Sequence, residues 1–359
     1  MKGSLSIFDE LTQSGLESGA FRGSVIRIEH QREPVFERSW GHALWTSAEN
    51  IPMDLAQLFD LASLSKLFTT TAVLRLMSTG FVREDSRLID LLEFKDSKLR
   101  DPLSGITLSA LLDHSSGLHY WYPFYTRSSE SFESILSFIV KEHPLTEGMV
   151  YSDLNFMLLG LTMERITGKP LREAMRDIVF RPLGLKTATY APEPLRCAAT
   201  EFGNRIERRM VAGLGLSFDA WRDETVPIRG ACDDGNAYYY FKGVAAHAGI
   251  FADAADVARL GALYLDGCDN RGGLFLDPSV RFSATTDRGS GRGLGFQFGD
   301  LYPGGGFGHT GFSGTYLHIN PVSGLTITIL TNRLHVAGPV NINEYRRAVS
   351  EAAVSLYTE

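Results

Sequence analysis

The segment LASLSKLFTTT, residues 61–71, contains a serine and a lysine three positions apart, Ser63 and Lys66. On a helix this spacing places two side chains on the same face. A serine hydroxyl is a weak nucleophile that needs a base to accept its proton. A lysine can be that base when burial or neighbouring positive charge lowers its pKa from about 10.4 towards neutrality. The pair could therefore carry out nucleophilic catalysis.

The same two residues also fit a purely structural role. Ser63 could cap the helix, with Lys66 as a solvated residue of its first turn. The chain contains 30 serines and 8 lysines, so about 0.7 Ser-x-x-Lys matches are expected by chance. The motif alone favours the structural role, and other segments must decide.

Two further segments favour catalysis. YSDLN places Tyr151 and Asp153 directly before an apolar helix. GHTGFSGTYLHI places His309, Thr310 and Gly311 ahead of a strand. Taken singly, the first could be a helix N-cap and the second a glycine-rich entrance to a strand. Behind a Ser-x-x-Lys helix, and in this order, they form a combination that chance seldom assembles.

With these motifs the chain resembles the penicillin-recognising serine hydrolases, especially the branch of class C β-lactamases, DD-peptidases and related esterases. Class A relatives carry Ser-x-x-Lys, Ser-Asp-Asn and Lys-Thr-Gly, and the class C branch has Tyr-x-Asn in the middle position. Three other segments also look like family segments. The motifs and segments are SLSK (63–66), YSD (151–153), HTG (309–311), LLDHSSGL (111–118), VAAHAGIFADAADVARL (244–260) and ILTNR (329–333).

The resemblance implies a role for each motif residue. Ser63 would be acylated and Lys66 would exchange its proton. Tyr151 would share the base role or protonate the leaving group. The backbone N–H groups of Ser63 and Phe312 would form the oxyanion hole. The residues for substrate binding or the oxyanion hole would be Asp153, His309, Thr310, Gly311 and Phe312.

Two positions depart from the family pattern. His309 stands where many relatives have lysine, and a histidine near its unperturbed pKa of about 6.5 carries only part of a charge at neutral pH. It should hold a substrate carboxylate weakly, which disfavours an efficient β-lactamase. Asp153 replaces asparagine, and a carboxylate near Lys66 would stabilise the ammonium. Either Asp153 points elsewhere or Tyr151 carries more of the base work.

Composition excludes several classes of protein. A formal charge of −7 gives no sign of the basic face that nucleic acids require. Cys197, Cys232 and Cys268 form no CxxC pair, so neither a zinc ribbon nor a disulfide framework is expected. The nine histidines form no HExxH motif, and the GxGxxG match at 306–311 leads into a strand instead of opening a helix. We therefore expect no metal and no cofactor.

The N-terminal segment MKGSLSIFDELTQSG lacks the apolar run of a signal peptide. No stretch reaches the roughly 18 apolar residues of a membrane span. The sequence as written predicts a cytoplasmic protein, or a periplasmic or secreted one if a leader peptide had been removed. It leaves the oligomeric state open.

Hydrophobic periodicity predicts strand-rich chain ends around a helical middle. Strands are expected in GSVIRIEH, PVFERSWG, GLGFQFGD, GTYLHIN and LTITILTNR, and helices near both termini. The predicted fold class is α/β, with an antiparallel sheet flanked by terminal helices and a mostly helical insertion. The expected domains are residues 1–60 with 240–359, and residues 61–239, with the active site in the cleft between them.

The predicted function is that of a serine acyl hydrolase that cleaves an ester, amide or β-lactam bond through an acyl-enzyme. Its partner would be a small-molecule or short-peptide acyl substrate. A β-lactamase or a D-Ala-D-Ala carboxypeptidase proper is one alternative. A non-catalytic penicillin-binding-like module is another, although such a module has little need of Ser63, Lys66 and Tyr151 together. The aromatic residues of HYWYPFY (119–125) could shape an apolar acyl pocket.

Overall fold

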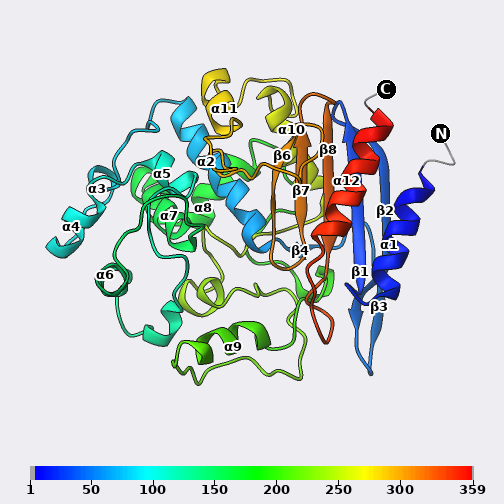
Figure 1. The fold of residues 1–359 in the computed structure, drawn as a ribbon, viewed down its shortest axis with the longest axis horizontal. Coiled ribbons are helices and arrows are strands. Elements are labelled where there is room, and N and C mark those ends of the chain that lie inside the picture. The colour runs from blue at the N-terminus through cyan, green and yellow to red at the C-terminus, as the bar shows by residue number, and fades with distance from the viewer. Residues whose placement is uncertain (1–4, 358–359) are drawn as a thin grey trace.

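The two ends of the chain build one antiparallel sheet in the computed structural model, which describes residues 5–357 (Figure 1). Residues 1–4, part of the segment without signal-peptide character, lie outside the described residues, as do 358–359. The strand order is β3-β2-β1-β8-β7-β6, so the first and last parts of the chain meet between β1 and β8. The strands are β1 (Gly23–His30), β2 (Glu33–Trp45), β3 (Asn50–Pro52), β6 (Phe307–Thr310), β7 (Tyr316–Asn320) and β8 (Leu325–Thr331).

Helices cover both faces of this sheet. The terminal helices α1 (Ser6–Glu17) and α12 (Asn343–Tyr357) lie side by side on one face, where Phe8 and Val349 join a buried cluster with the strands (Figure 1). Helix α10 (Ala254–Asp266) packs on β7 and β8. Gly261 allows this close packing, because a Cβ atom there would lie 2.8 Å from the Thr326 side chain.

Helix α2 (Ser65–Ser78) lies at the centre of the molecule and carries the Ser-x-x-Lys segment at its start. Buried residues surround it on all sides, as expected of a helix enclosed by protein. It packs against α7 (Asp153–Thr167), which begins at the second motif. The other helices are α3 (Leu88–Leu91), α4 (Ser97–Leu103), α5 (Leu108–Leu112), α6 (Phe132–Glu142), α8 (Leu171–Met175), α9 (Arg205–Gly213) and α11 (Pro278–Ala284), and a small second sheet pairs β4 (Phe59–Asp60) with β5 (Phe251–Ala252).

The predicted fold class is confirmed, but one predicted strand is wrong and four short strands, β3, β4, β5 and β6, were not predicted. Residues 293–300, GLGFQFGD, form only isolated bridges, because Gly295 adopts a left-handed φ of +82° that a strand does not tolerate. Instead, β6 is the edge strand, and it contains His309 and Thr310 themselves. The domain boundaries at residues 60/61 and 239/240 stay predictions.

Among residues 5–357, no helix has the length and apolar character needed to cross a bilayer. The cytoplasmic location stays a prediction.

Candidate active site

Ser63 lies in a short 3₁₀ turn, Ala62–Leu64, that leads directly into α2. The preceding residue, Ala62, has a φ of +46°, a left-handed conformation that non-glycine residues rarely adopt. The Asp60 carboxylate accepts a hydrogen bond of 2.9 Å from the Ala62 N–H and so supports this turn. Backbone strain of this kind concentrates at functional sites. The turn presents the Ser63 hydroxyl to two cavities described below.

Lys66 is completely buried and makes three polar contacts. Its Nζ donates to Ser63 Oγ at 3.0 Å and to the His247 carbonyl oxygen at 3.0 Å. It also lies 2.7 Å from Asp153 Oδ1 in an ion pair. Lys66 is therefore no solvated first-turn residue: it links the proposed nucleophile to the start of α7.

The charge of Lys66 follows from these neighbours. Burial by itself would lower the pKa of the ammonium, but the Asp153 carboxylate and the Tyr151 hydroxyl outweigh it, so the pKa of Lys66 lies above its ordinary value. Of the two alternatives left open by the sequence, the one in which Asp153 points elsewhere is wrong.

Tyr151 stands between the two positive charges of the site. Its ring centroid lies 5.1 Å from Lys66 Nζ and 5.0 Å from the guanidinium carbon of Arg292. On another side His114 packs on the ring at 4.5 Å, and burial holds the pKa of His114 well below its usual range. His114 also accepts a hydrogen bond of 3.1 Å from the Ser152 N–H, which fixes the backbone beside Tyr151.

His309 does not contact the cavity that its motif borders. Only 1% of its surface is exposed, and its Nδ1 lies 2.7 Å from the Thr310 carbonyl oxygen. Burial and the nearby charges of Arg292 and Lys66 lower the pKa of His309 well below its ordinary value, so the ring is neutral at pH 7. The expectation that His309 supplies little positive charge agrees with this, but a role as a direct carboxylate ligand does not.

The rest of the third motif lies against the Ser63 turn. Gly311 has no room for a side chain, because a Cβ atom would lie 2.4 Å from the Leu61 carbonyl oxygen. The Gly311 N–H donates to Thr315 at 2.7 Å, which forms the tight turn between β6 and β7. The N–H of the next residue, Phe312, donates no hydrogen bond to any described residue and is available for a substrate oxygen.

A cavity of about 440 Å³, here called the basic pocket, opens on one side of Ser63. It contains three arginines and no acidic residue. Arg333 and Arg346 are tied to backbone carbonyl oxygens, whereas the Arg292 side chain donates no hydrogen bond to the described residues. The lining residues are Ser63, Tyr151, Arg292, Gln297, Thr310, Gly311, Phe312, Arg333, Asn341, Ile342, Asn343 and Arg346.

A second cavity of about 270 Å³, here called the acidic pocket, opens on the other side and shares Ser63, Tyr151 and Phe312 with the first. Five carboxylates line it, with no lysine, arginine or histidine. Aromatic residues 120 and 121 also line it, as the sequence predicted for an acyl pocket, but its acidic character was missed. The lining residues are Ala62, Ser63, Tyr120, Trp121, Tyr151, Asp153, Glu201, Ile206, Glu207, Met210, Asp233, Asp234, Ala248 and Phe312.

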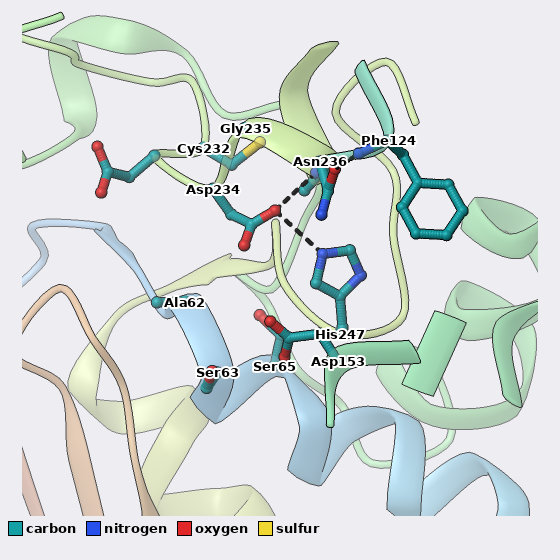
Figure 2. A network of polar contacts seen from close by, with 12 residues as sticks. Ala62, Ser63, Ser65, Phe124, Asp153, Cys232, Asp234, Gly235, Asn236 and His247 are labelled. Carbon is teal, nitrogen blue, oxygen red and sulfur yellow. Dashed lines mark hydrogen bonds and ion pairs between the residues drawn. The ribbon is translucent and has the colours of Figure 1, made fainter. Parts of the chain in front are cut away.

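His247 contacts both Asp234 of the acidic pocket and Lys66, and Figure 2 shows its contact with Asp234. Its Nε2 lies 3.0 Å from Asp234 Oδ1, while its carbonyl oxygen accepts from Lys66 Nζ. The His247 side chain is fully buried and hydrogen-bonded, as is usual for a core histidine. Asp233, Asp234 and Arg292 were not singled out, because each lies in a loop without a recognisable motif.

Comparison with known proteins agrees with this geometry. The profile of the family described as Beta-lactamase matches residues 8–351. A protein of Escherichia coli K12 named "Putative D-alanyl-D-alanine carboxypeptidase" is 30% identical, over 88% of this chain and 79% of its own. The N-acetylmuramyl-L-alanine amidase of Bacillus subtilis 168 is 29% identical, over 91% and 80%. The D-amino acid amidase of Ochrobactrum anthropi SV3 shares the fold, with a TM-score of 0.73 at 20% identity over 98% and 99%.

The chain therefore belongs to the β-lactamase family. It is a serine acyl hydrolase of this family.

Proposed function

We propose that this protein hydrolyses an ester or amide bond of a small molecule or short peptide through an acyl-enzyme on Ser63. The single observation that carries the proposal is the contact of Lys66 Nζ with Ser63 Oγ at 3.0 Å and with Asp153 Oδ1 at 2.7 Å. A fully buried ammonium beside a serine at the start of a helix can stabilise the negative charge that develops when the serine attacks a carbonyl carbon.

Tyr151 is the base in this proposal. Lys66 is held as an ammonium and donates its hydrogen bond to Ser63, so it has no lone pair to accept the serine proton. Tyr151 lines both pockets beside Ser63, and its ring lies next to the positive charges of Lys66 and Arg292. Tyr151 accepts the proton as Ser63 Oγ bonds to the substrate carbonyl carbon, and then gives it to the leaving group as the old bond breaks.

The carbonyl oxygen becomes negatively charged in this step. The N–H groups of Ser63 and Phe312 would bind that oxygen as an oxyanion hole, with Gly311 fixing the approach of the two turns. Thr310 lines the basic pocket, where it would hold the polar end of the leaving group. Water then attacks the acyl-enzyme by the same route and releases the acid.

Two observations favour the amide bond of an amino acid as the natural target. The relatives named above are a carboxypeptidase and an amidase by name, and both activities cleave amide bonds next to amino-acid residues. The basic pocket beside Ser63 is suited to the carboxylate of a leaving amino acid.

Turnover of p-nitrophenyl acetate tests the proposal. We expect Ser63→Ala to abolish turnover, and the matched variant Ser65→Ala to retain it, because Ser65 Oγ accepts only a backbone hydrogen bond from Ile250. We also expect the ester to be a better substrate than nitrocefin, because the buried, neutral His309 gives the carboxylate of that β-lactam no cationic partner in the third motif. Unchanged turnover by Ser63→Ala would refute the proposal, and a nitrocefin rate far above the ester rate would refute the substrate order.

A further inference from the structure

The acidic pocket contains five carboxyl groups, more than its neighbours pair. Four of its five carboxylates have partners. Asp153 pairs with Lys66, and Asp234 with His247. Glu207 accepts hydrogen bonds from the Gly235 N–H and the Tyr125 hydroxyl, and Glu201 accepts longer ones from the Ile206 N–H.

Asp233 is the exception. Only 7% of its surface is exposed, and the buried oxygen Oδ1 has no hydrogen-bond partner among the described residues. Its N–H donates to Asp60 Oδ2 at 2.7 Å, which fixes the residue beside the Ser63 turn. The neighbouring Arg222 donates to the carbonyl oxygens of Cys232 and Asp233, not to the Asp233 carboxylate. A buried carboxylate without a partner is costly and needs an explanation.

The pKa values of Asp233 and Glu207 in the acidic pocket also indicate that little positive charge lies near these two carboxyl groups. Burial and the carboxylates of Glu201 and Asp60 raise the pKa of Asp233 well above its ordinary value. Burial and Asp234 raise the pKa of Glu207 to about 8. A cation placed in this cavity would favour the ionised form of these carboxyl groups and so act against both shifts.

The shape of the cavity selects an organic cation. Among residues 5–357, no group of three or more histidine, cysteine, aspartate or glutamate side chains is placed to hold a metal ion. The remaining walls are apolar or aromatic, with Tyr120, Trp121, Ile206 and Met210 among them. Aromatic faces attract ammonium groups, and apolar walls suit a hydrocarbon side chain.

We propose that the acidic pocket binds the free α-ammonium group of the substrate's acyl arm, with Asp233 as its ligand, so that the substrates are aminoacyl amides, aminoacyl esters or dipeptides. This inference rests on the proposed function, because the pocket opens at Ser63. In a dipeptide, the ammonium lies on the acyl side of the scissile bond and the carboxylate on the leaving side. The two pockets offer the opposite charges on the two sides of Ser63.

Calorimetric binding tests this inference independently of turnover. Leucinamide and N-acetyl-leucinamide, each as D and L enantiomers, are titrated into full-length Ser63→Ala protein at pH about 7, where an α-amino group with a pKa of about 7.7–8.0 is mostly protonated. For at least one enantiomer we expect the free amine to bind about tenfold or more tightly than its acetylated form, the size typical of a charge-assisted hydrogen bond.

The Asp233→Asn change, made in the same Ser63→Ala background, should bring the ratio of the two affinities, free amine over acetylated form, close to one. Asp101→Asn, which removes an exposed carboxylate from α4, should leave it unchanged. Equal or tighter binding of both acetylated compounds by the Ser63→Ala protein would overturn the inference, even if p-nitrophenyl acetate is hydrolysed. A tenfold preference without ester turnover would instead support the inference and count against the proposed function.

Discussion

The basic and acidic pockets meet at Ser63 and are built in opposite ways. In the basic pocket, Arg333 and Arg346 are held by backbone carbonyl oxygens and Arg292 is left unbound beside Tyr151. In the acidic pocket, four carboxylates have partners and Asp233 has none. Each pocket thus contains one ionisable side chain, Arg292 or Asp233, that is not hydrogen-bonded to another described residue and is available to a substrate. We infer that the opposite charges of the pockets on the two sides of Ser63, as well as their shapes, orient the substrate.

The two pockets also differ in how firmly they keep their charge. Burial lowers the pKa of Arg346 to about 10, which is still above neutral pH, so the guanidinium stays charged without a ligand. Burial and Asp234 raise the pKa of Glu207 to about 8, so this carboxyl holds its proton at neutral pH until a cation arrives. The basic pocket therefore attracts carboxylates at all times, whereas the acidic pocket gains its full charge only on binding.

The largest effect is expected from Arg292→Met. A dipeptide with a free carboxylate should have a much lower KM than the same dipeptide as its C-terminal amide, because the Arg292 side chain donates no hydrogen bond to the described residues. The change should reduce this preference about 10- to 100-fold, as for loss of a charge-assisted hydrogen bond. Steady-state kinetics with both substrates measures it.

Arg100→Met, an exposed arginine on α4, is the matched control and should keep the preference. The contrary result is that Arg292→Met lowers kcat equally for both dipeptides and leaves the ratio of their KM values unchanged. That result would mean that Arg292 acts through Tyr151 alone and does not bind the substrate carboxylate in the basic pocket.

A smaller effect is expected from Asp153→Asn. Without this carboxylate, burial dominates and lowers the pKa of Lys66. Because activity requires the ammonium form, the rate falls as pH rises through that pKa, and the alkaline limb of the kcat/KM profile should move at least about one unit towards lower pH. Ester turnover measured across the pH range, with Asp101→Asn as control, reports the shift. An unmoved limb would mean that Asp153 does not set the charge of Lys66.

The elements that carry the proposed catalytic residues could be predicted because their signals are local in sequence. Ser63 and Lys66 lie within one helical turn, and Tyr151 directly precedes a helix, so spacing alone brings each motif together. Strands β1, β2, β7 and β8 of the sheet could be predicted from period-two alternation and apolar runs. The irregular course of residues 293–300 could not, because Gly295 adopts a left-handed conformation at a place where a Cβ atom would lie 2.0 Å from Thr70 Oγ1, and no pattern of hydrophobicity reports this.

The specificity of the site depends on contacts between distant segments. Asp233 lies in a loop after α9, and Arg292 in a loop before β6, and neither residue differs in type from many exposed ones. Only the fold shows that both border cavities that open at Ser63, and that neither side chain is hydrogen-bonded to any residue of 5–357. The orientation of Asp153 towards Lys66 was likewise undecidable from sequence, because a residue at a helix start can turn to either side.

The central claim is that Ser63 is the acylated nucleophile, and covalent labelling tests it most directly. The folded protein is incubated with a fluorophosphonate and examined by intact-mass spectrometry and peptide mapping. We predict a single adduct on Ser63, retained in Ser65→Ala and absent from Ser63→Ala. A folded wild-type protein that gains no adduct, or that carries it on another residue, would contradict the account.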